Sequence, residues 1–390
     1  MNFTDRKEVV RLFLSEGYQL DEIALDFLTK NTNKIKEILA FLKKSHPTTT
    51  TLTHDKIETL FKPKDTTTEI LKIPRLAQNT ITASATLNYF NIRYDFIKNL
   101  LKNRLELTNL TSINKIGRTK QFSLIVLIRD TNHENNKIIV DDKTGVTSVS
   151  FDEPSKVQYL LKDEVVGLVC RQSEYGAELL NAIYPNISIR REITKTKEKT
   201  ICVLLPDLAQ DIETPKYLDG YKKLGNEVQD GNIYFFVLGG LPKNAKEFLN
   251  HLPKKSKVFL MENNSAKQEN TVVLDDPSII RVGGATLFLS SGTFLKKYEE
   301  IFKLPATETL TKLIKKMHLN PTFEIGDQIY ENDPFLLDIL PNVIAVGSGN
   351  SSGSVNYKGI TVLATGKIGA QPAAWAINLQ TRETIKIDFT

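Results

Sequence analysis

Cysteine and histidine are scarce in this chain of 390 residues, which has two cysteines and five histidines. Cys170 and Cys202 both lie inside apolar, strand-like runs, so we predict two buried free thiols in a reducing compartment and no disulfide framework. No stretch approaches the roughly 18 uninterrupted apolar residues of a membrane span. The polar start, residues 1–7, lacks the apolar core of a signal peptide. We therefore expect a soluble cytoplasmic protein with no membrane partner.

A strong excess of one charge is also missing. The 51 lysines and arginines and the 46 aspartates and glutamates leave a net charge of +5. Such a charge permits a nucleic-acid or acidic protein partner but does not require one. The length predicts two or three domains, and the 41% of hydrophobic residues can supply each of them with a core.

The first 86 residues divide into a helical part and a linker. Residues 1–45 carry apolar positions at helical spacing, which predict three short helices. These positions are Val9, Leu12 and Phe13, then Ile23, Phe27 and Leu28, then Ile35, Ile38, Leu39 and Leu42. A helical module of this kind suits a docking function and a structural cap equally well. Residues 46–86 contain threonine runs and three prolines, which favour a flexible, mostly extended linker.

Residues 87–192 predict an aromatic helix followed by a β-barrel. The apolar runs favour strands at 122–128, 138–140, 146–151, 165–170 and 177–184, and a short helix-like piece lies at 154–161. Five strands with a helix between the third and the fourth is the order of an OB-fold barrel.

Residues 193–390 predict a layered α/β domain. The runs at 201–205, 233–238 and 258–261 are wholly apolar, which is typical of strands buried on both faces. Helix-like segments follow at 244–252, 293–302 and 307–318, and the end of the chain is rich in strands. Alternation of this kind indicates a sheet covered by helices, with mixed strand directions near its end.

Four stretches, and the order of the parts, resemble the small subunits of archaeal D-family DNA polymerases. The stretches are Tyr89–Tyr94 (YFNIRY), residues 161–167 (LKDEVVG), residues 182–187 (AIYPNI) and residues 317–321 (MHLNP). The resemblance covers residues 87–390, whereas the helical module matches only in place and size. It implies that residues 193–390 form a calcineurin-like phosphoesterase domain, a fold that hydrolyses phosphodiesters with two divalent metal ions.

In that family the metal ligands lie in five strand-end motifs, and here nearly all of them are replaced. Only Asp207 and Asn263 are kept. The positions that have lost a carboxylate or imidazole ligand are Ala209, Gly240, Asn264, Ser265, Ser291, Ser348 and Asn350. Glycine and alanine have no donor atom, and a neutral hydroxyl or amide is a weak ligand. We therefore predict no catalytic residue, no metal site and no cofactor.

Three further patterns support weaker hypotheses. A substitute metal site could use Asp211, Asp219, Asp275 or Asp276, but Asp275–Pro277 is more typical of a turn. The loop at 349–353 matches a hydrolase nucleophile elbow, yet a strand is predicted where the elbow requires a helix. Basic residues at 115–120 and 190–199 suit phosphate contacts or a solvated linker, so DNA-binding residues stay unassigned.

The resemblance favours a non-catalytic scaffold subunit. It would bind the large catalytic subunit of DNA polymerase D in a heterodimer and meet DNA through that complex, at the nucleoid. The helical module would recruit other replication proteins. Two alternatives stay open: a metal-dependent 3′–5′ proofreading exonuclease with substituted ligands, and a free-standing OB-fold protein that binds single strands.

Overall fold

The chain forms two compact units, residues 1–68 and residues 69–390. The computed structural model describes residues 6–30, 32, 35, 38–39, 51–53, 68–76, 82–117, 120–132, 135–188, 191–208, 232–241, 245–253, 256–261, 270–324, 327–366 and 373–388. Among these residues, no helix combines the length and the apolar composition that a membrane crossing needs.

The first unit is built around helices α1 (Arg6–Ser15) and α2 (Glu22–Lys30). The Asp21 carboxylate caps α2 by accepting a hydrogen bond from the Ala24 N–H at 2.6 Å. A short parallel pair, β1 (Gln19–Leu20) with β2 (Thr51–Leu52), adds buried Leu52 to the core. Residues 51–52 therefore belong to this unit rather than to the predicted linker. Ile35 and Ile38 join the same core, while most of the third predicted helix lies outside the described residues.

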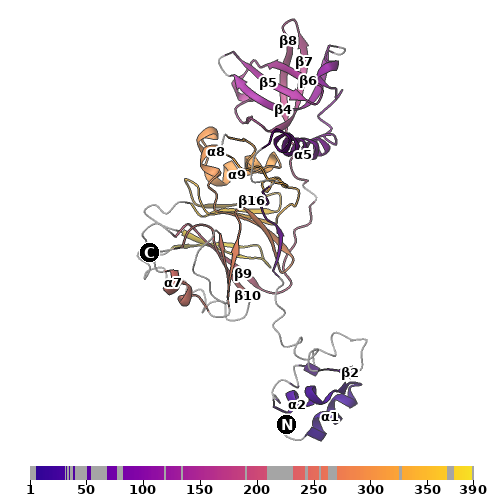
Figure 1. The fold of residues 1–390 in the computed structure, drawn as a ribbon, viewed down its shortest axis with the longest axis vertical. Coiled ribbons are helices and arrows are strands. Elements are labelled where there is room, and N and C mark those ends of the chain that lie inside the picture. The colour runs from indigo at the N-terminus through magenta and orange to yellow at the C-terminus, as the bar shows by residue number, and fades with distance from the viewer. Residues whose placement is uncertain are drawn as a thin grey trace. The chain divides into compact units, whose positions relative to one another are not determined.

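A closed five-stranded barrel follows helix α5 (Ala83–Leu101) (Figure 1). Its strands, in spatial order, are β4 (Gln121–Asn132), β5 (Lys137–Asp142), β6 (Gly145–Ser150), β8 (Gly176–Ile183) and β7 (Val165–Ser173). The apolar run in strand β4 is long because its alternate residues are buried in two different cores. Leu124 and Val126 fill the barrel, whereas Ile125 and Leu127 pack outside it in a core shared with α5.

The second unit also contains two six-stranded mixed sheets. The first sheet has the order β12 (Thr271–Leu274), β11 (Lys257–Met261), β10 (Asn232–Val237), β9 (Thr200–Leu205), β18 (Ala373–Asn378) and β19 (Thr384–Asp388). The second has the order β16 (Gly353–Tyr357), β17 (Ile360–Ala364), β15 (Val343–Val346), β14 (Ala285–Ser290), β13 (Ser278–Val282) and β3 (Glu69–Lys72). The predicted linker of residues 46–86 thus contributes an edge strand, β3, to this sheet.

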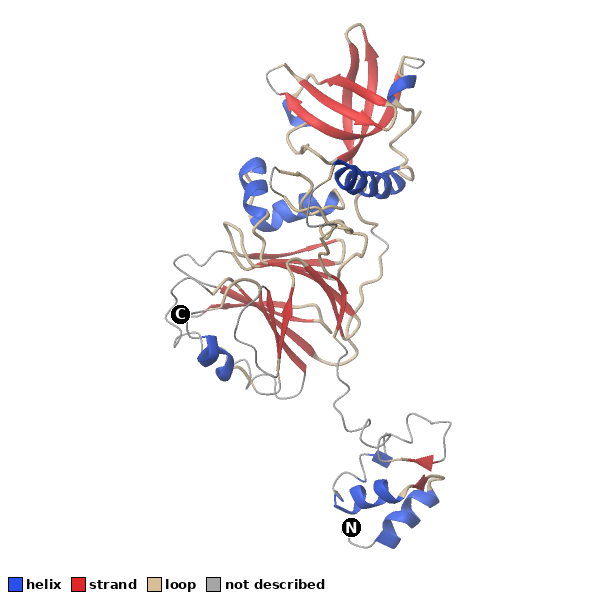
Figure 2. Cartoon of the chain, in the orientation of Figure 1, coloured by secondary structure: helices blue, strands red, loops and turns tan. Residues whose placement is uncertain are grey.

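The sheets face each other and carry helices on their outer faces (Figure 2). Cys202 and Leu204 of β9 point toward Leu287 and Leu289 of β14 in the core between the sheets. The alternate residues of β9 pack with helix α7 (Ala245–His251). On the far side, helices α8 (Leu295–Phe302) and α9 (Ala306–Lys315) cover the second sheet. The layer order is therefore helix, sheet, sheet, helix.

Candidate metal centre and a buried polar junction

The loops that carry the predicted metal motifs meet at one edge of the two sheets. Parallel strands β9 and β10 end before Asp207 and Gly240, and parallel strands β14 and β15 end before Ser291 and Ser348. The Gly240 N–H donates to Asp207 Oδ1 at 2.9 Å, and Ser348 Oγ donates to the Gly292 carbonyl at 2.5 Å. Gly347, after β15, lies so close to Leu238, after β10, that a Cβ atom at this glycine would collide with it. The loops of the two strand pairs are therefore in direct contact. Ala209, Asn263, Asn264 and Ser265 lie outside the described residues.

The polar groups at this edge bind one another. The Ser291 hydroxyl donates to Asp276 Oδ2, and the Ser291 N–H lies 3.2 Å from both oxygens of that carboxylate. The Asn350 N–H lies 3.0 Å from both oxygens of the buried Glu299 carboxylate on α8. The sequence pattern at Asp276 favoured a turn over a substitute metal ligand, and nothing in that pattern indicated its contact with Ser291.

These residues do not fit a two-metal centre. Two divalent ions held a few Å apart need a bridging carboxylate and several imidazole or carboxylate ligands. Gly240, which the family resemblance places at the bridging carboxylate, presents only a backbone N–H, whose partial positive charge repels a cation. In the part of the chain that the structure describes, no group of three or more His, Cys, Asp or Glu residues is arranged to hold a metal.

The loop at 349–353 has a structural role. It leads into strand β16 rather than into the helix that a nucleophile elbow requires. The Ser351 Oγ accepts a hydrogen bond from the Ala306 N–H at 3.1 Å, at the start of α9. This hydroxyl therefore caps a helix instead of facing a catalytic base.

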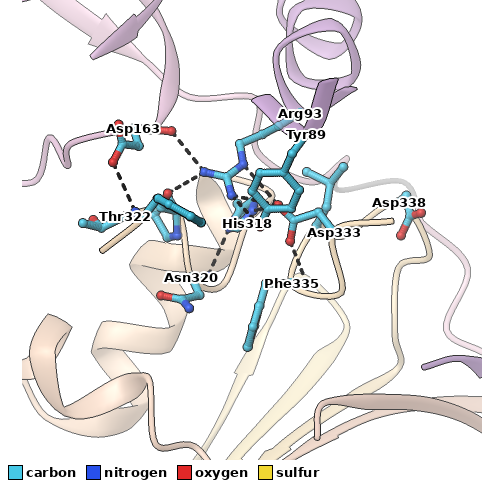
Figure 3. A network of polar contacts seen from close by, with 12 residues as sticks. Tyr89, Arg93, Asp163, His318, Asn320, Thr322, Asp333, Phe335 and Asp338 are labelled. Carbon is cyan, nitrogen blue, oxygen red and sulfur yellow. Dashed lines mark hydrogen bonds and ion pairs between the residues drawn. The ribbon is translucent and has the colours of Figure 1, made fainter. Parts of the chain in front are cut away.

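A second polar cluster joins α5 to the loops around residues 318–333, and its centre is the buried side chain of Arg93 (Figure 3). Arg93 Nε and Nη2 donate to Asp333 Oδ2 at 3.1 and 2.8 Å. Nη1 donates to the carbonyls of Asp163 and Pro321 at 3.3 and 2.5 Å. Nη2 also donates to the Tyr89 hydroxyl at 2.9 Å. The guanidinium thus links α5, the start of β7 and the segment after α9.

His318 completes this junction as a neutral imidazole. Its Nδ1 accepts the Asn320 N–H at 3.1 Å, so its proton lies on Nε2, which donates to Asp333 Oδ2 at 2.7 Å. Burial lowers the pKa of His318 to about 4. The negative charge of Asp333 opposes this shift, and the positive charge of Arg93 adds to it. Burial alone would raise the pKa of Asp333, but His318 and Arg93 together hold that pKa below its ordinary value.

A buried ion pair lies beside the junction. Lys316 Nζ lies 2.6 Å from Glu164 Oε2, and both side chains are 2% exposed. Lys316 also donates to the Tyr159 carbonyl at 2.6 Å and lies over the Tyr184 ring. Burial lowers the pKa of Lys316 and raises that of Glu164, while each charge opposes the shift of the other. The contact ties the end of α9 to the barrel.

All four stretches that carry the family resemblance meet in these two clusters. Arg93 lies in the first stretch and Glu164 in the second, Tyr184 lies in the third, and His318 lies in the fourth. His318, one of the five histidines of the chain, is buried at this junction. The arginine, the aspartate and the lysine of the clusters were not identified from the sequence.

The basic cluster at 190–199 is partly structural. Arg191 donates to the carbonyls of Leu340 and Pro341, each at 2.8 Å, and so fixes the segment that leaves the barrel. Arg118 and Arg190 lie outside the described residues.

No protein-family model and no curated protein matches the sequence. Solved structures match about half of it. One, from the characterisation of a novel archaeal phosphodiesterase, covers 48% of this chain and 99% of its own, with 10% identity and a TM-score of 0.29. A mutant of Vps29 from Entamoeba histolytica covers 49% of this chain and 99% of its own length, with 13% identity and a TM-score of 0.29. A predicted phosphoesterase from Streptococcus pneumoniae TIGR4 covers 49% of this chain and 98% of its own length, with 9% identity and a TM-score of 0.25. These values are too low to carry over an activity.

Proposed function

We propose that this chain is a non-catalytic scaffold subunit of an archaeal D-family DNA polymerase. Its second unit would combine an OB-fold barrel with a calcineurin-like phosphoesterase fold that has lost its two-metal centre. The strand order of the closed barrel and the helix–sheet–sheet–helix layering support these two assignments. The resemblance of residues 87–390 supports the polymerase partner.

One observation carries the proposal. At the position of the bridging metal ligand, the Gly240 N–H donates to Asp207, the carboxylate that survives from the first motif. This hydrogen bond links the two loops directly, and a glycine supplies no second carboxylate that could bridge a pair of ions. The barrel and the α/β layers meanwhile share a continuous apolar core and the two buried polar clusters. A rigid body of this kind can bind a partner without any chemistry of its own.

Co-expression with the large subunit of an archaeal D-family polymerase tests the scaffold function. We expect the two chains to co-purify and to elute together in size-exclusion chromatography. As a matched control, an unrelated OB-fold protein carrying the same affinity tag should not retain the large subunit. Separate elution of the two chains at micromolar concentration would contradict the proposal.

The exonuclease alternative has one observation in its favour, because Asp276 brings an additional carboxylate to the same group of loops. Metal content after dialysis against manganese, together with digestion of single-stranded 3′ ends, distinguishes the two functions. We expect substoichiometric metal and no digestion. Stoichiometric manganese together with digestion that Asp207→Ala abolishes would establish the exonuclease instead.

A further inference from the structure

Basic and aromatic side chains alternate along one surface where α9 meets the barrel. Lys312 Nζ lies 3.8 Å from the ring centroid of Tyr159. Lys315 and Lys358 each place Nζ 5.7 Å from the ring centroid of Tyr357. All five side chains are partly exposed. We refer to these five residues as the cationic patch.

The patch is held in place by three elements that are distant in sequence. The Tyr357 hydroxyl donates to Asn186 Oδ1 at 2.7 Å, and Lys358 Nζ donates to the Ile187 carbonyl at 2.8 Å. The Asn186 N–H donates to the Lys315 carbonyl at 2.9 Å. The exit of the barrel, the end of α9 and the β16–β17 turn are therefore fixed against one another, so a ligand would meet a preformed surface.

The three lysines have no acidic partner among the described residues: no ion pair joins Lys312, Lys315 or Lys358 to a carboxylate there. Burial and the nearby Lys312 lower the pKa of Lys315. Burial, then Arg104 and Lys315, lowers the pKa of Lys358. Three lysines grouped on one surface create a positive local potential that favours the binding of an anion.

We infer that the cationic patch binds the phosphate backbone of single-stranded nucleic acid. Unpaired lysines bind phosphates and release the counterions that the strand carries. The partly exposed rings of Tyr159 and Tyr357 beside these lysines offer surfaces on which bases stack, the combination found in proteins that bind single strands without sequence preference. An acidic peptide would need the lysines but not the rings. The inference does not depend on the polymerase partner, and it places the contact outside the barrel interior and away from the degenerate metal motifs.

Fluorescence anisotropy with a labelled oligothymidylate and the full chain tests the inference, with titrations at several sodium chloride concentrations. Contacts from three lysines predict a slope of log K against log salt near −2, since each phosphate contact on a single strand contributes about −0.7. The Lys312→Gln/Lys315→Gln variant should weaken binding at low salt by at least about tenfold and make the slope shallower by about 1.4. Within the part of the chain that the structure describes, neither side chain makes a hydrogen bond, so the fold should survive, and thermal melting checks this.

The matched control is Lys143→Gln/Lys296→Gln, which removes the same charge from exposed lysines that pair with Asp95 and Glu300. This variant should bind within about twofold of the unmodified chain, because the lysines it removes are already paired. Three results would overturn the inference: no binding by the unmodified chain, an equal loss in both double variants, or displacement of the oligonucleotide by polyglutamate at the same charge concentration. Failure of the chain to bind a polymerase subunit would leave this test unaffected.

Discussion

Replacing Arg93 with methionine removes the guanidinium that joins α5 to the elements on either side. This residue is 2% exposed, and its side chain donates to the Asp333 carboxylate, the Tyr89 hydroxyl and two backbone carbonyls. Without it, the carboxylate stays buried and keeps the hydrogen bond from His318 as its main support. Removing one partner from a buried ion pair costs about 3–5 kcal/mol, because the remaining charge is uncompensated. We expect Arg93→Met to lower the free energy of unfolding by about this amount at pH 7.

Urea unfolding of the full chain measures this loss. The single tryptophan, Trp375, lies on β18 and reports on the α/β sheets through its fluorescence, and far-ultraviolet circular dichroism reports on the whole chain. The matched control is Arg129→Met, since Arg129 bonds Asp141 at 2.7 Å with a side chain that is 59% exposed. Such exposed pairs contribute at most about 1 kcal/mol. If Arg93→Met unfolds at the same urea concentration as this control, the buried junction does not hold the barrel on the sheets.

Three further changes test the buried groups and the metal motifs. The pKa of His318 is about 4 in the folded chain, below its ordinary value of about 6.5, so the unfolded chain binds the proton more tightly. The contribution of His318 to the free energy of unfolding is complete above pH 6.5 and falls by up to about 3 kcal/mol as the pH drops to 4. Urea titrations over this pH range should show a smaller loss of stability for His318→Gln than for the unmodified chain, and equal losses would contradict this. Lys316→Met should cost about 3–5 kcal/mol in the same assay, and adding Glu164→Gln should restore most of it, because the uncompensated charge is then gone; a double variant no more stable than the single one would refute the pairing. Asp207→Ala removes the acceptor of the Gly240 N–H and should lower stability by about 1 kcal/mol in thermal melts, while co-purification with the large subunit persists.

The strands were largely predictable because their apolar patterns leave little choice. The run at 201–205 lies within β9, and residues 343–346 in the strand-rich end of the chain form β15. Both strands are buried on two faces, so all of their side chains except that of Thr200 are apolar, and periodicity is not needed to find them. Strand β3 was missed because it is short and lies at a sheet edge with exposed Glu69 and Ile70. An edge strand of four residues carries little pattern.

The polar junction could not be found in the same way. Arg93 and Asp333 lie 240 residues apart, and an arginine on an amphipathic helix ordinarily lies at the surface. Only the tertiary contact makes its burial tolerable. The four resemblance stretches nevertheless include three of its members, Tyr89, Arg93 and His318. The stretches chosen for their resemblance therefore coincide with a structural interface that composition and periodicity did not indicate.

On the proposed assignment, metal ligands could be lost without unfolding the chain, because the apolar cores do not include the ligand positions. The packing between the sheets and beneath the helices is apolar, and the strand-end loops are closed by hydrogen bonds such as that between Gly240 and Asp207. Carboxylates grouped at such an edge without a cation would repel one another by about 1–4 kcal/mol at 4 Å. Replacing them with glycine and serine removes this repulsion.

Restoring a single carboxylate at this edge should destabilise the folded chain. Gly240→Asp returns a carboxylate beside Asp207 while the neighbouring ligands stay absent, so the two charges repel. We expect Gly240→Asp to melt at a lower temperature than Gly240→Asn, a control of the same size without the charge. The difference should shrink in about 1 M sodium chloride, where the Debye length falls to about 3 Å. Equal melting of the two variants at low salt would show that the loop edge tolerates the returned charge, and relief from repulsion would then not explain the lost ligands.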